Sequence, residues 1–150
     1  MKNKNLFPML SVSEVNELLK QEEIFNFIGI EFEKLEKGYS RLKFNFNEKL
    51  TRIGGILHGG VVFSAVDYAG SYAVRTLDKV KDGVTAELKI NFLKPMKEGP
   101  FTVEPRVISE GKRLVVVDIS AYDGNSNLCA KALGTWVVYR ETNSETQLSS

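Results

Sequence analysis

The feature that most constrains the fold is an apolar stretch from residue 59 to residue 77. Drawn as an α-helix, this stretch carries apolar side chains around almost its whole circumference, namely Val61, Val62, Phe63, Ala65, Val66, Ala69, Ala73 and Val74. A helix that is apolar on every side is usually buried at the centre of a domain. The stretch also contains Asp67 and Arg75, and two charges argue against a membrane span. We therefore expect a buried central helix.

A shorter helix is expected before it, from about residue 13 to residue 25. Ser11 and Glu14 have the spacing of a capping box, in which each side chain accepts a hydrogen bond from the backbone N–H of the other residue. An apolar stripe then follows at helical spacing, formed by Val15, Leu18, Leu19, Ile24 and Phe25. Residues 28–46 predict a hairpin interrupted at Lys37-Gly38, and residues 47–57 predict a loop.

The chain beyond residue 80 alternates in the manner of strands. The clearest run places Val84, Ala86, Leu88, Ile90 and Phe92 on one face, and Thr85, Glu87, Lys89 and Asn91 on the other. Further strands are expected over residues 101–108, 114–122 and 128–139, with a turn at 123–125. Pro105 lies within the first of these, which indicates an edge strand or a bulge because proline cannot donate to a ladder.

Together these elements predict an α+β domain in which one antiparallel sheet wraps around the central helix. One sheet cannot cover a helix completely, so some apolar surface should remain, and pairing with a second copy would bury it. The domain is expected to span residues 11–140. An N-terminal arm at residues 1–10 should precede it, and a polar, disordered tail at residues 141–150 should follow.

Composition argues against several kinds of partner. The chain has 20 Lys+Arg and 19 Asp+Glu, and a net charge of +1 predicts neither nucleic-acid binding nor an acidic membrane surface as a partner. The N-terminus lacks the long apolar segment of a secretory signal. The single cysteine, Cys129, cannot form an internal disulfide, and its apolar surroundings predict a small core residue. We expect a cytoplasmic protein.

The residues just before the central helix are the first candidates for chemistry. His58 is the only histidine, which leaves no His-rich metal site, and we expect neither metal nor cofactor. It is surrounded by Gly54, Gly55, Gly59 and Gly60, and so many glycines indicate unusual backbone angles or close approach. Free N–H groups at a helix start can bind an anion or a developing oxyanion. The alternative is an ordinary glycine-rich turn.

Asp67 is the second candidate, because it lies about two turns into an otherwise apolar helix. A buried carboxylate must be paired, hydrated or functional, and one in this place could act as a general base or nucleophile. The alternatives are pairing with Arg75 or a serine, or a solvent-facing side of the helix. Ser64 and Ser71 share its helical face, and Ser71 is the expected hydrogen-bond partner.

Two further positions are weaker candidates. Thr85 opens the clearest strand on its polar face, where threonine is usually only solvent-facing. Lys112-Arg113 forms a small basic turn after Gly111, which could contact phosphates, although solvated turn charges are the commoner case.

Taken together, Gly55-Ile56-Leu57-His58-Gly59-Gly60 and Asp67 resemble the G-x-x-H-G-G…D signature of hot-dog-fold thioesterases. The nearest branch is that of the phenylacetyl-CoA-pathway and mammalian thioesterase-superfamily-member-2 enzymes. The segment from Gly83 to Pro95 is similar to that family's strand after the central helix. Gly111-Lys112-Arg113 and Cys129-Ala130-Lys131-Ala132 fit its later strands, so the resemblance covers about residues 25–140. It implies the hot-dog fold, an antiparallel sheet wrapped around a long helix.

The resemblance also implies an activity, the hydrolysis of an acyl-CoA thioester to free acid and CoA. In that family the backbone N–H at the position of Gly59 polarises the thioester carbonyl. The counterpart of Asp67, contributed by the neighbouring subunit, activates water or attacks directly, and that of Thr85 helps to position the water. The implied assembly is a homodimer with active sites at the subunit interface, which pairs into a dimer of dimers.

The remaining positions carry supporting roles under the same resemblance. His58 shapes the turn and contacts the thioester side, Gly60 and Ser71 contact substrate, and Lys112-Arg113 meets the CoA phosphates. Arg52 also lies at a substrate-contacting position, but there the family often has an asparagine that places the water or the carbonyl. Arginine cannot accept a hydrogen bond as an amide can.

Arg52 therefore favours an alternative, a non-catalytic acyl-CoA-binding or sensing protein on the same fold. A hot-dog dehydratase is a third possibility and is disfavoured, because it would be expected to have an Asp and a His within one short loop, whereas His58 sits in His-Gly-Gly.

Overall fold

The computed structural model describes residues 11–141, so the predicted arm at residues 1–10 and nearly all of the predicted tail lie outside the described residues. In chain order the elements are α1 (Val12–Leu19), α2 (Glu23–Ile28), β1 (Glu31–Glu36), β2 (Tyr39–Phe44), the 3-10 turn η1 (Glu48–Leu50), α3 (Gly59–Arg75), β3 (Val80–Phe92), β4 (Phe101–Glu110), β5 (Leu114–Tyr122) and β6 (Leu128–Arg140). The strands form one antiparallel sheet in the order β1-β2-β4-β5-β6-β3. This sheet and its central helix confirm the predicted α+β architecture.

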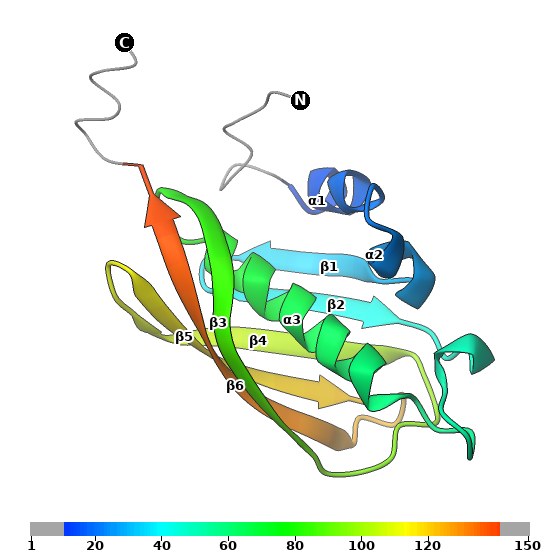
Figure 1. Ribbon diagram of the computed structural model, residues 1–150. Helices are drawn as coiled ribbons and strands as arrows, with labels where there is room; N and C mark the ends of the chain where they lie inside the picture. The colour runs from blue at the N-terminus through cyan, green and yellow to red at the C-terminus, as the bar shows by residue number, and fades with distance from the viewer. Residues whose placement is uncertain (1–10, 142–150) are drawn as a thin grey trace.

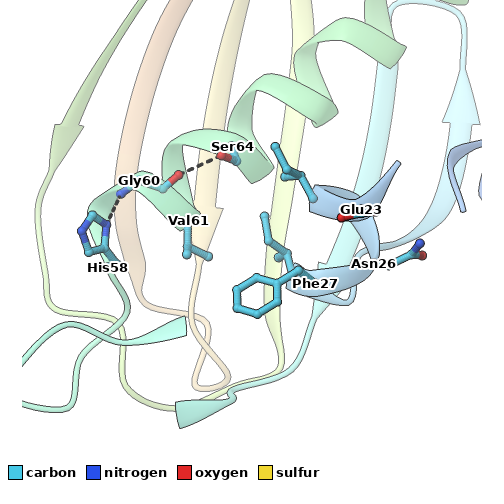
Figure 2. A pocket seen from close by; sticks show the side chains of 9 residues that line it. Glu23, Asn26, Phe27, His58, Gly60, Val61 and Ser64 are labelled. Atoms are coloured by element: carbon cyan, nitrogen blue, oxygen red, sulfur yellow. Dashed lines mark hydrogen bonds between the residues drawn. The ribbon is translucent and has the colours of Figure 1, made fainter. Parts of the chain in front are cut away.

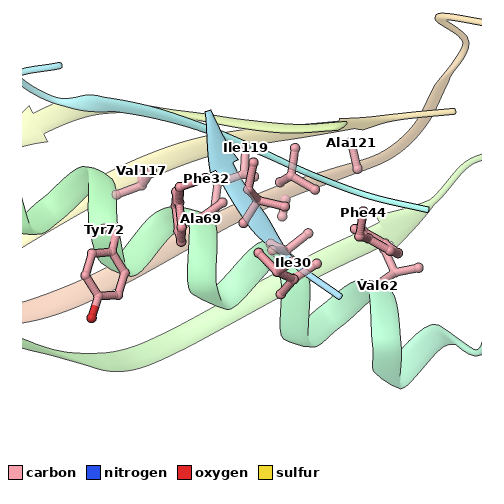
Figure 3. Close-up of a cluster of buried hydrophobic side chains, with 14 of the residues drawn as sticks. Ile30, Phe32, Phe44, Val62, Ala69, Tyr72, Val117, Ile119 and Ala121 are labelled. Atoms are coloured by element: carbon pink, nitrogen blue, oxygen red, sulfur yellow. The ribbon is translucent and has the colours of Figure 1, made fainter. Parts of the chain in front are cut away.

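The long helix α3 lies across one face of the sheet and contacts all six strands (Figure 1). Its sheet-facing side is built from small residues, and a Cβ added at Gly70 would lie only 2.5 Å from the Trp136 ring. Glycine is therefore required for this close approach. The core fills the space between α3 and the sheet, with Phe32, Phe44, Val62 and Ile119 all almost fully buried (Figure 3). The predicted helix over residues 59–77 is confirmed, except that it ends at Arg75.

One side of α3 stays uncovered, as predicted for a helix packed on a single sheet. Phe63 keeps 39% of its surface exposed, and Ser64 and Asp67 along the same side are only partly buried. Among residues 11–141, no helix combines the length and the hydropathy needed to cross a membrane.

Strand β3 contains a bulge that changes which side chains face α3. Thr85 lies opposite Trp136 and Glu87 lies opposite Thr135, so Ala86 is an extra residue on β3. Before the bulge the odd-numbered positions face the helix, since a Cβ at Gly83 would lie 3.2 Å from Val74 of α3. After the bulge Leu88 and Ile90 pack against the core.

The uninterrupted alternation predicted for this strand is therefore wrong. Val84, expected on the buried face, is 51% exposed, while Thr85 turns inward. The physical reason is the inserted residue at Ala86, because one extra residue reverses the phase of a period-two pattern.

The N-terminal helix also differs from the prediction, because residues 13–25 belong to two helices. The capping box of Ser11 and Glu14 is confirmed by reciprocal hydrogen bonds of 2.8 and 3.1 Å. α1 ends at Leu19, the chain becomes extended at Glu22, and α2 begins at Glu23. Phe25 and Ile28 of α2 are buried, whereas Ile24, predicted in the same apolar stripe, is 60% exposed.

Pro105 does not mark an edge, because β4 lies between β2 and β5. β2 and β4 keep one register on both sides of Pro105, with Tyr39 opposite Arg106 and Leu42 opposite Val103, and no bridged pair of the two strands includes Pro105. Pro105 has no N–H to donate there. The bulge of β4 lies further along the strand, between Val107 and Ser109.

Candidate active site

The start of α3 presents one free backbone donor. His58 is the extended N-cap residue, and its Nδ1 accepts a hydrogen bond of 2.9 Å from the backbone N–H of Gly60. The His58 carbonyl accepts from the N–H groups of Val61 and Val62. Within the described part of the chain, the N–H of Gly59 meets no acceptor. Because it lies at the positive end of the helix dipole, this N–H is suited to a carbonyl oxygen that gains negative charge.

The turn before His58 explains the other two glycines. Gly54 and Gly55 have φ angles of +105° and +82°, a region that side chains rarely adopt. The turn is closed by a hydrogen bond of 2.9 Å from the Arg52 N–H to the Ile56 carbonyl, and the Arg52 guanidinium bonds back to the Ile53 carbonyl. The glycines at residues 54 and 55 thus shape the turn, while the donor itself comes from Gly59.

Gly59 lines a hollow of about 340 Å³, which we name the Gly59 hollow. Its lining includes Arg52 and Lys94 as charged residues, together with Phe92, whose ring would lie 3.4 Å from a Cβ at Gly59. The glycine thus faces an aromatic ring, and the hollow beside it carries two cations and no acidic residue.

Asp67 is held by a threonine from the neighbouring strand. The Thr85 hydroxyl donates a hydrogen bond of 2.7 Å to Asp67 Oδ1, which leaves Asp67 Oδ2 for another partner. The β3 bulge makes this contact possible by turning Thr85 toward α3. The alternating pattern predicts Thr85 on the outer face, and only the bulge turns it toward Asp67, near which the family resemblance also implies a role for it.

The other partners predicted for Asp67 are engaged elsewhere. The Ser71 hydroxyl, expected to bond the carboxylate, accepts instead a hydrogen bond of 3.0 Å from Trp136 Nε1. Arg75 pairs with Asp82 of β3. The reason is geometric, because the indole N–H of the buried Trp136 needs an acceptor and Ser71 is the one it reaches.

Asp67 and Ser71 both line a second hollow of about 410 Å³, which we name the Asp67 hollow. Tyr68 lies beside Asp67 and donates a hydrogen bond of 2.5 Å to Glu22 Oε1, which ties the start of α2 to α3. Burial, followed by the hydrogen bond to Glu22, raises the pKa of Tyr68 above its ordinary value. The tyrosine therefore stays protonated and acts as a donor.

Gly59 and Asp67 do not meet within one subunit. They are separated by eight positions along α3, which corresponds to about 12 Å at the helical rise of 1.5 Å per residue. They also line different hollows. A single reacting carbonyl cannot contact both groups of the same chain.

Lys112 and Arg113 lie apart from the Gly59 hollow and from the Asp67 hollow. They line a basic hollow of about 670 Å³ together with Lys81 and Arg140. This hollow adjoins the first residues of β3, whereas Phe92 beside Gly59 is the last residue of that strand. Arg140 is committed to structure through Glu110 and the carbonyls of Asp78, Gly111 and Lys112. Lys112 and Arg113 remain exposed.

A further hollow, of about 750 Å³, was missed by sequence reasoning. It lies between α2 and the start of α3 and is lined by Ile24, Phe27, Ile28, Val61, His58 and Ser64, among others (Figure 2). We name it the α2 hollow. The only signal in the sequence was the apolar pair of Ile24 and Phe27, and the stripe that carries Ile24 pointed to the core instead. Within residues 11–141, no group of His, Cys, Asp or Glu is placed to hold a metal ion.

The chain matches known proteins over most of its length. Residues 54–130 match the family model described as the thioesterase superfamily. A Sulfurisphaera tokodaii protein named "Putative esterase" is 50% identical, over 89% of this chain and 100% of its own. A Salmonella typhimurium protein named medium/long-chain acyl-CoA thioesterase is 27% identical, over 74% of this chain and 82% of its own.

Solved structures give the same fold. A thioesterase from Haemophilus influenzae has a TM-score of 0.81 at 22% identity, over 89% of this chain and 93% of its own. A Streptococcus mutans protein solved with bound acetyl-CoA has a TM-score of 0.72 at 26% identity, over 80% of this chain and 96% of its own.

Proposed function

Because the chain belongs to the thioesterase superfamily, and so has the hot-dog fold, we propose that it hydrolyses an acyl-CoA thioester to free acid and CoA. The observation that carries the proposal is that α3 presents two groups suited to thioester hydrolysis. One is the free N–H of Gly59 at the helix start, and the other is the Asp67 carboxylate held by Thr85 in an otherwise apolar helix. The first suits a developing oxyanion and the second suits activation of water.

We propose that two copies of the chain complete each site, Gly59 from one and Asp67 from the other. The separation of about 12 Å along α3 supports this, since one subunit cannot present both groups to one carbonyl. The sheet supports it as well, because β3 is an edge strand. Antiparallel pairing of two β3 strands about a twofold axis would also set the two α3 helices antiparallel, with the start of one beside the middle of the other.

In the proposed reaction the thioester oxygen accepts the Gly59 N–H hydrogen bond. Asp67 Oδ2 takes a proton from water while the water oxygen bonds to the carbonyl carbon, and Thr85 holds Oδ1 in place. The tetrahedral intermediate then breaks its C–S bond, and the CoA sulfur takes the proton back from Asp67. Direct attack by Asp67 on the carbonyl carbon, through an anhydride that water then hydrolyses, uses the same groups.

The other predicted residues take supporting roles in this proposal. His58 fixes the turn by holding the Gly60 N–H, so that only the Gly59 N–H remains for the substrate oxygen. Ser71 lies in the Asp67 hollow but acts through Trp136, which it anchors. Arg52, in the Gly59 hollow, offers a phosphate contact in place of the asparagine amide.

The basic residues would come together only in the dimer. Antiparallel β3 pairing places the first residues of one β3 near the last residues of the other, so the basic hollow of one subunit would adjoin the Gly59 hollow of its partner. Lys112 and Arg113 would then join Arg52 and Lys94 around the CoA phosphates. The name of the Salmonella relative and the acetyl-CoA bound to the Streptococcus protein support a CoA ester as the substrate.

The test is a panel of acyl-CoAs with a chromogenic thiol reagent that reports released CoA. The only thiol of the protein, Cys129, is fully buried as predicted, and burial raises its pKa, so the reagent reports the product. We expect turnover of at least one acyl-CoA, and a loss of roughly 100-fold or more in Asp67→Asn with unchanged folding. Tight acyl-CoA binding with no turnover by the wild type would point to the non-catalytic binding protein instead.

A further inference from the structure

We infer that the α2 hollow is the binding site for an aliphatic acyl chain, and that Ile24 and Phe27 of α2 set the chain lengths the protein accepts. The inference rests on the proposed function, because it takes the thioester carbonyl to lie at Gly59. It assigns the acyl end of the substrate to the α2 hollow and the CoA end to the Gly59 hollow.

The two hollows beside the start of α3 differ in charge. The Gly59 hollow contains Arg52 and Lys94, which suit the phosphates of CoA. The α2 hollow contains no Lys or Arg, and its one carboxylate, Glu23, would repel those phosphates. Residues on both sides of Gly59, namely His58 and Gly60, line the α2 hollow, so a carbonyl at Gly59 can direct its tail there.

Three polar side chains around the α2 hollow have hydrogen-bond partners within the chain. The Ser64 hydroxyl donates to the Gly60 carbonyl at 2.9 Å, and the Asn26 amide donates to the Lys20 carbonyl at 2.7 Å. His58 Nδ1 accepts the Gly60 N–H (Figure 2). An occupant therefore needs no hydrogen-bonding group to satisfy these three side chains, which suits an alkyl chain. The volume of about 750 Å³ lies in the range of roughly 300–1,000 Å³ found for small-molecule sites.

The apolar wall of the hollow belongs to a firmly anchored helix. Phe25 and Ile28 of α2 are buried in the core, and Phe25 makes an edge-to-face contact with Tyr68 at 5.5 Å. Tyr68 also binds Glu22 at the start of α2. Ile24 and Phe27 nevertheless stay 60% and 57% exposed, because they face the hollow. Large apolar side chains held at an open hollow are typical of a ligand wall.

The test compares kcat/KM for acetyl-, octanoyl- and phenylacetyl-CoA in the wild type and in Ile24→Trp, which narrows the hollow at its α2 wall. The matched control is Ile108→Trp on β4, where the isoleucine is 61% exposed and lines none of the described hollows. Each buried methylene is worth about a fourfold gain in binding. We therefore expect octanoyl-CoA hydrolysis to fall at least about tenfold in Ile24→Trp, with acetyl-CoA changed less than about threefold and the control unchanged.

Phe27→Ala supplies the opposite change, because it widens the hollow without touching the core. It should shift the preference toward longer chains, with palmitoyl-CoA gaining relative to octanoyl-CoA. An equal loss for all substrates in Ile24→Trp, no loss for octanoyl-CoA, or a loss confined to phenylacetyl-CoA would overturn the inference. A change of oligomeric state in Ile24→Trp, measured by light scattering, would also overturn it, since a second copy would then occupy the hollow.

A binding measurement distinguishes failure of the proposed hydrolysis from failure of the proposed acyl-chain site. S-octyl-CoA, a thioether that cannot be hydrolysed, is titrated into the wild type and Ile24→Trp by calorimetry. If no acyl-CoA is turned over but the thioether binds at least about tenfold more weakly to Ile24→Trp, the proposed function fails and the acyl-chain site stands. Equal thioether binding to both proteins, or binding to neither, would sink the acyl-chain site.

Discussion

The two edges of the sheet are built in opposite ways. β1, at one edge, has six residues and carries mostly charged side chains. β3, at the other edge, has thirteen residues and includes the exposed Val84. An edge strand exposes a row of unpaired backbone groups, and proteins usually protect it with short length, charge or a covering element. β1 has all three protections, whereas β3 is long and no described strand pairs with its free edge.

The protection of β1 comes from α1, whose Asn16 side chain takes the place of a neighbouring strand. Its amide donates to the Phe32 carbonyl at 3.0 Å and its carbonyl accepts the Phe32 N–H at 2.8 Å. Glu33 adds ion pairs to Arg41 and Lys43 of β2. The outward backbone groups at Phe32 are thus satisfied within one subunit.

β3 pairs only with β6 among the described strands, and its free side is long and carries apolar residues. The contrast with β1 teaches that the uncovered edge is a specific property of β3 and not of the sheet as a whole. It also carries the residue that holds Asp67, so the same strand serves both the proposed dimer and the proposed site.

The largest effect is expected from blocking the β3 edge with charge. In Val84→Lys/Ala86→Lys, the charges added to the exposed edge of each β3 strand would oppose pairing of the two strands and separate the subunits. We expect monomers by light scattering and a loss of about 100-fold or more in kcat/KM, because each site would lose its partner's carboxylate. Glu36→Lys on β1 raises the net charge equally and should leave both unchanged. A fully active monomer would refute the composite site.

A smaller effect is expected from the inward residue of β3. Thr85→Val keeps the shape of the side chain but removes the hydrogen bond to Asp67, and a hydrogen bond to a charged group is worth about one factor of ten or more. We expect kcat to fall about tenfold with the dimer intact, and Thr85→Ser to restore most of it. If Thr85→Val were as active as Thr85→Ser, the hydroxyl would have no role in positioning Asp67.

The smallest effect on activity is expected at the protected edge. Asn16→Ala leaves the N–H and C=O of Phe32 without partners, which should lower the free energy of unfolding by about 1–2 kcal/mol in denaturant titration. Activity and oligomeric state should stay as in the wild type. Glu17→Ala, an exposed neighbour on α1, is the control and should change stability by less. An altered oligomeric state in Asn16→Ala would mean that β1 also takes part in assembly.

The parts of the fold that sequence predicted are those with a local pattern. The central helix follows from apolar residues over several turns, and the capping box of Ser11 and Glu14 is set by three-residue spacing. The donor at Gly59 was expected for the same reason, since any helix start leaves free N–H groups.

The parts that sequence missed depend on contacts between distant segments. The bulge at Ala86 exists only relative to β6, and it decides that Thr85, rather than Ser71, binds Asp67. The break at Glu22 interrupts a continuous apolar stripe, and only the packing of Phe25 against Tyr68 reveals which residues of α2 face outward. Hydrophobic pattern alone cannot separate a residue of the core from one in the wall of a hollow.

Because of the bulge in β3, the site depends on the number of residues in this strand as much as on which residues they are. Deleting Ala86 would remove only a methyl side chain, yet it would rotate Gly83 and Thr85 to the opposite face of the sheet or shift every later pair with β6. Insertions and deletions in this strand should therefore be selected against as strongly as loss of the threonine itself. A redesign that preserves every functional group but alters the number of residues between Thr85 and Leu88 would lose the hydrogen bond from Thr85 to the Asp67 carboxylate.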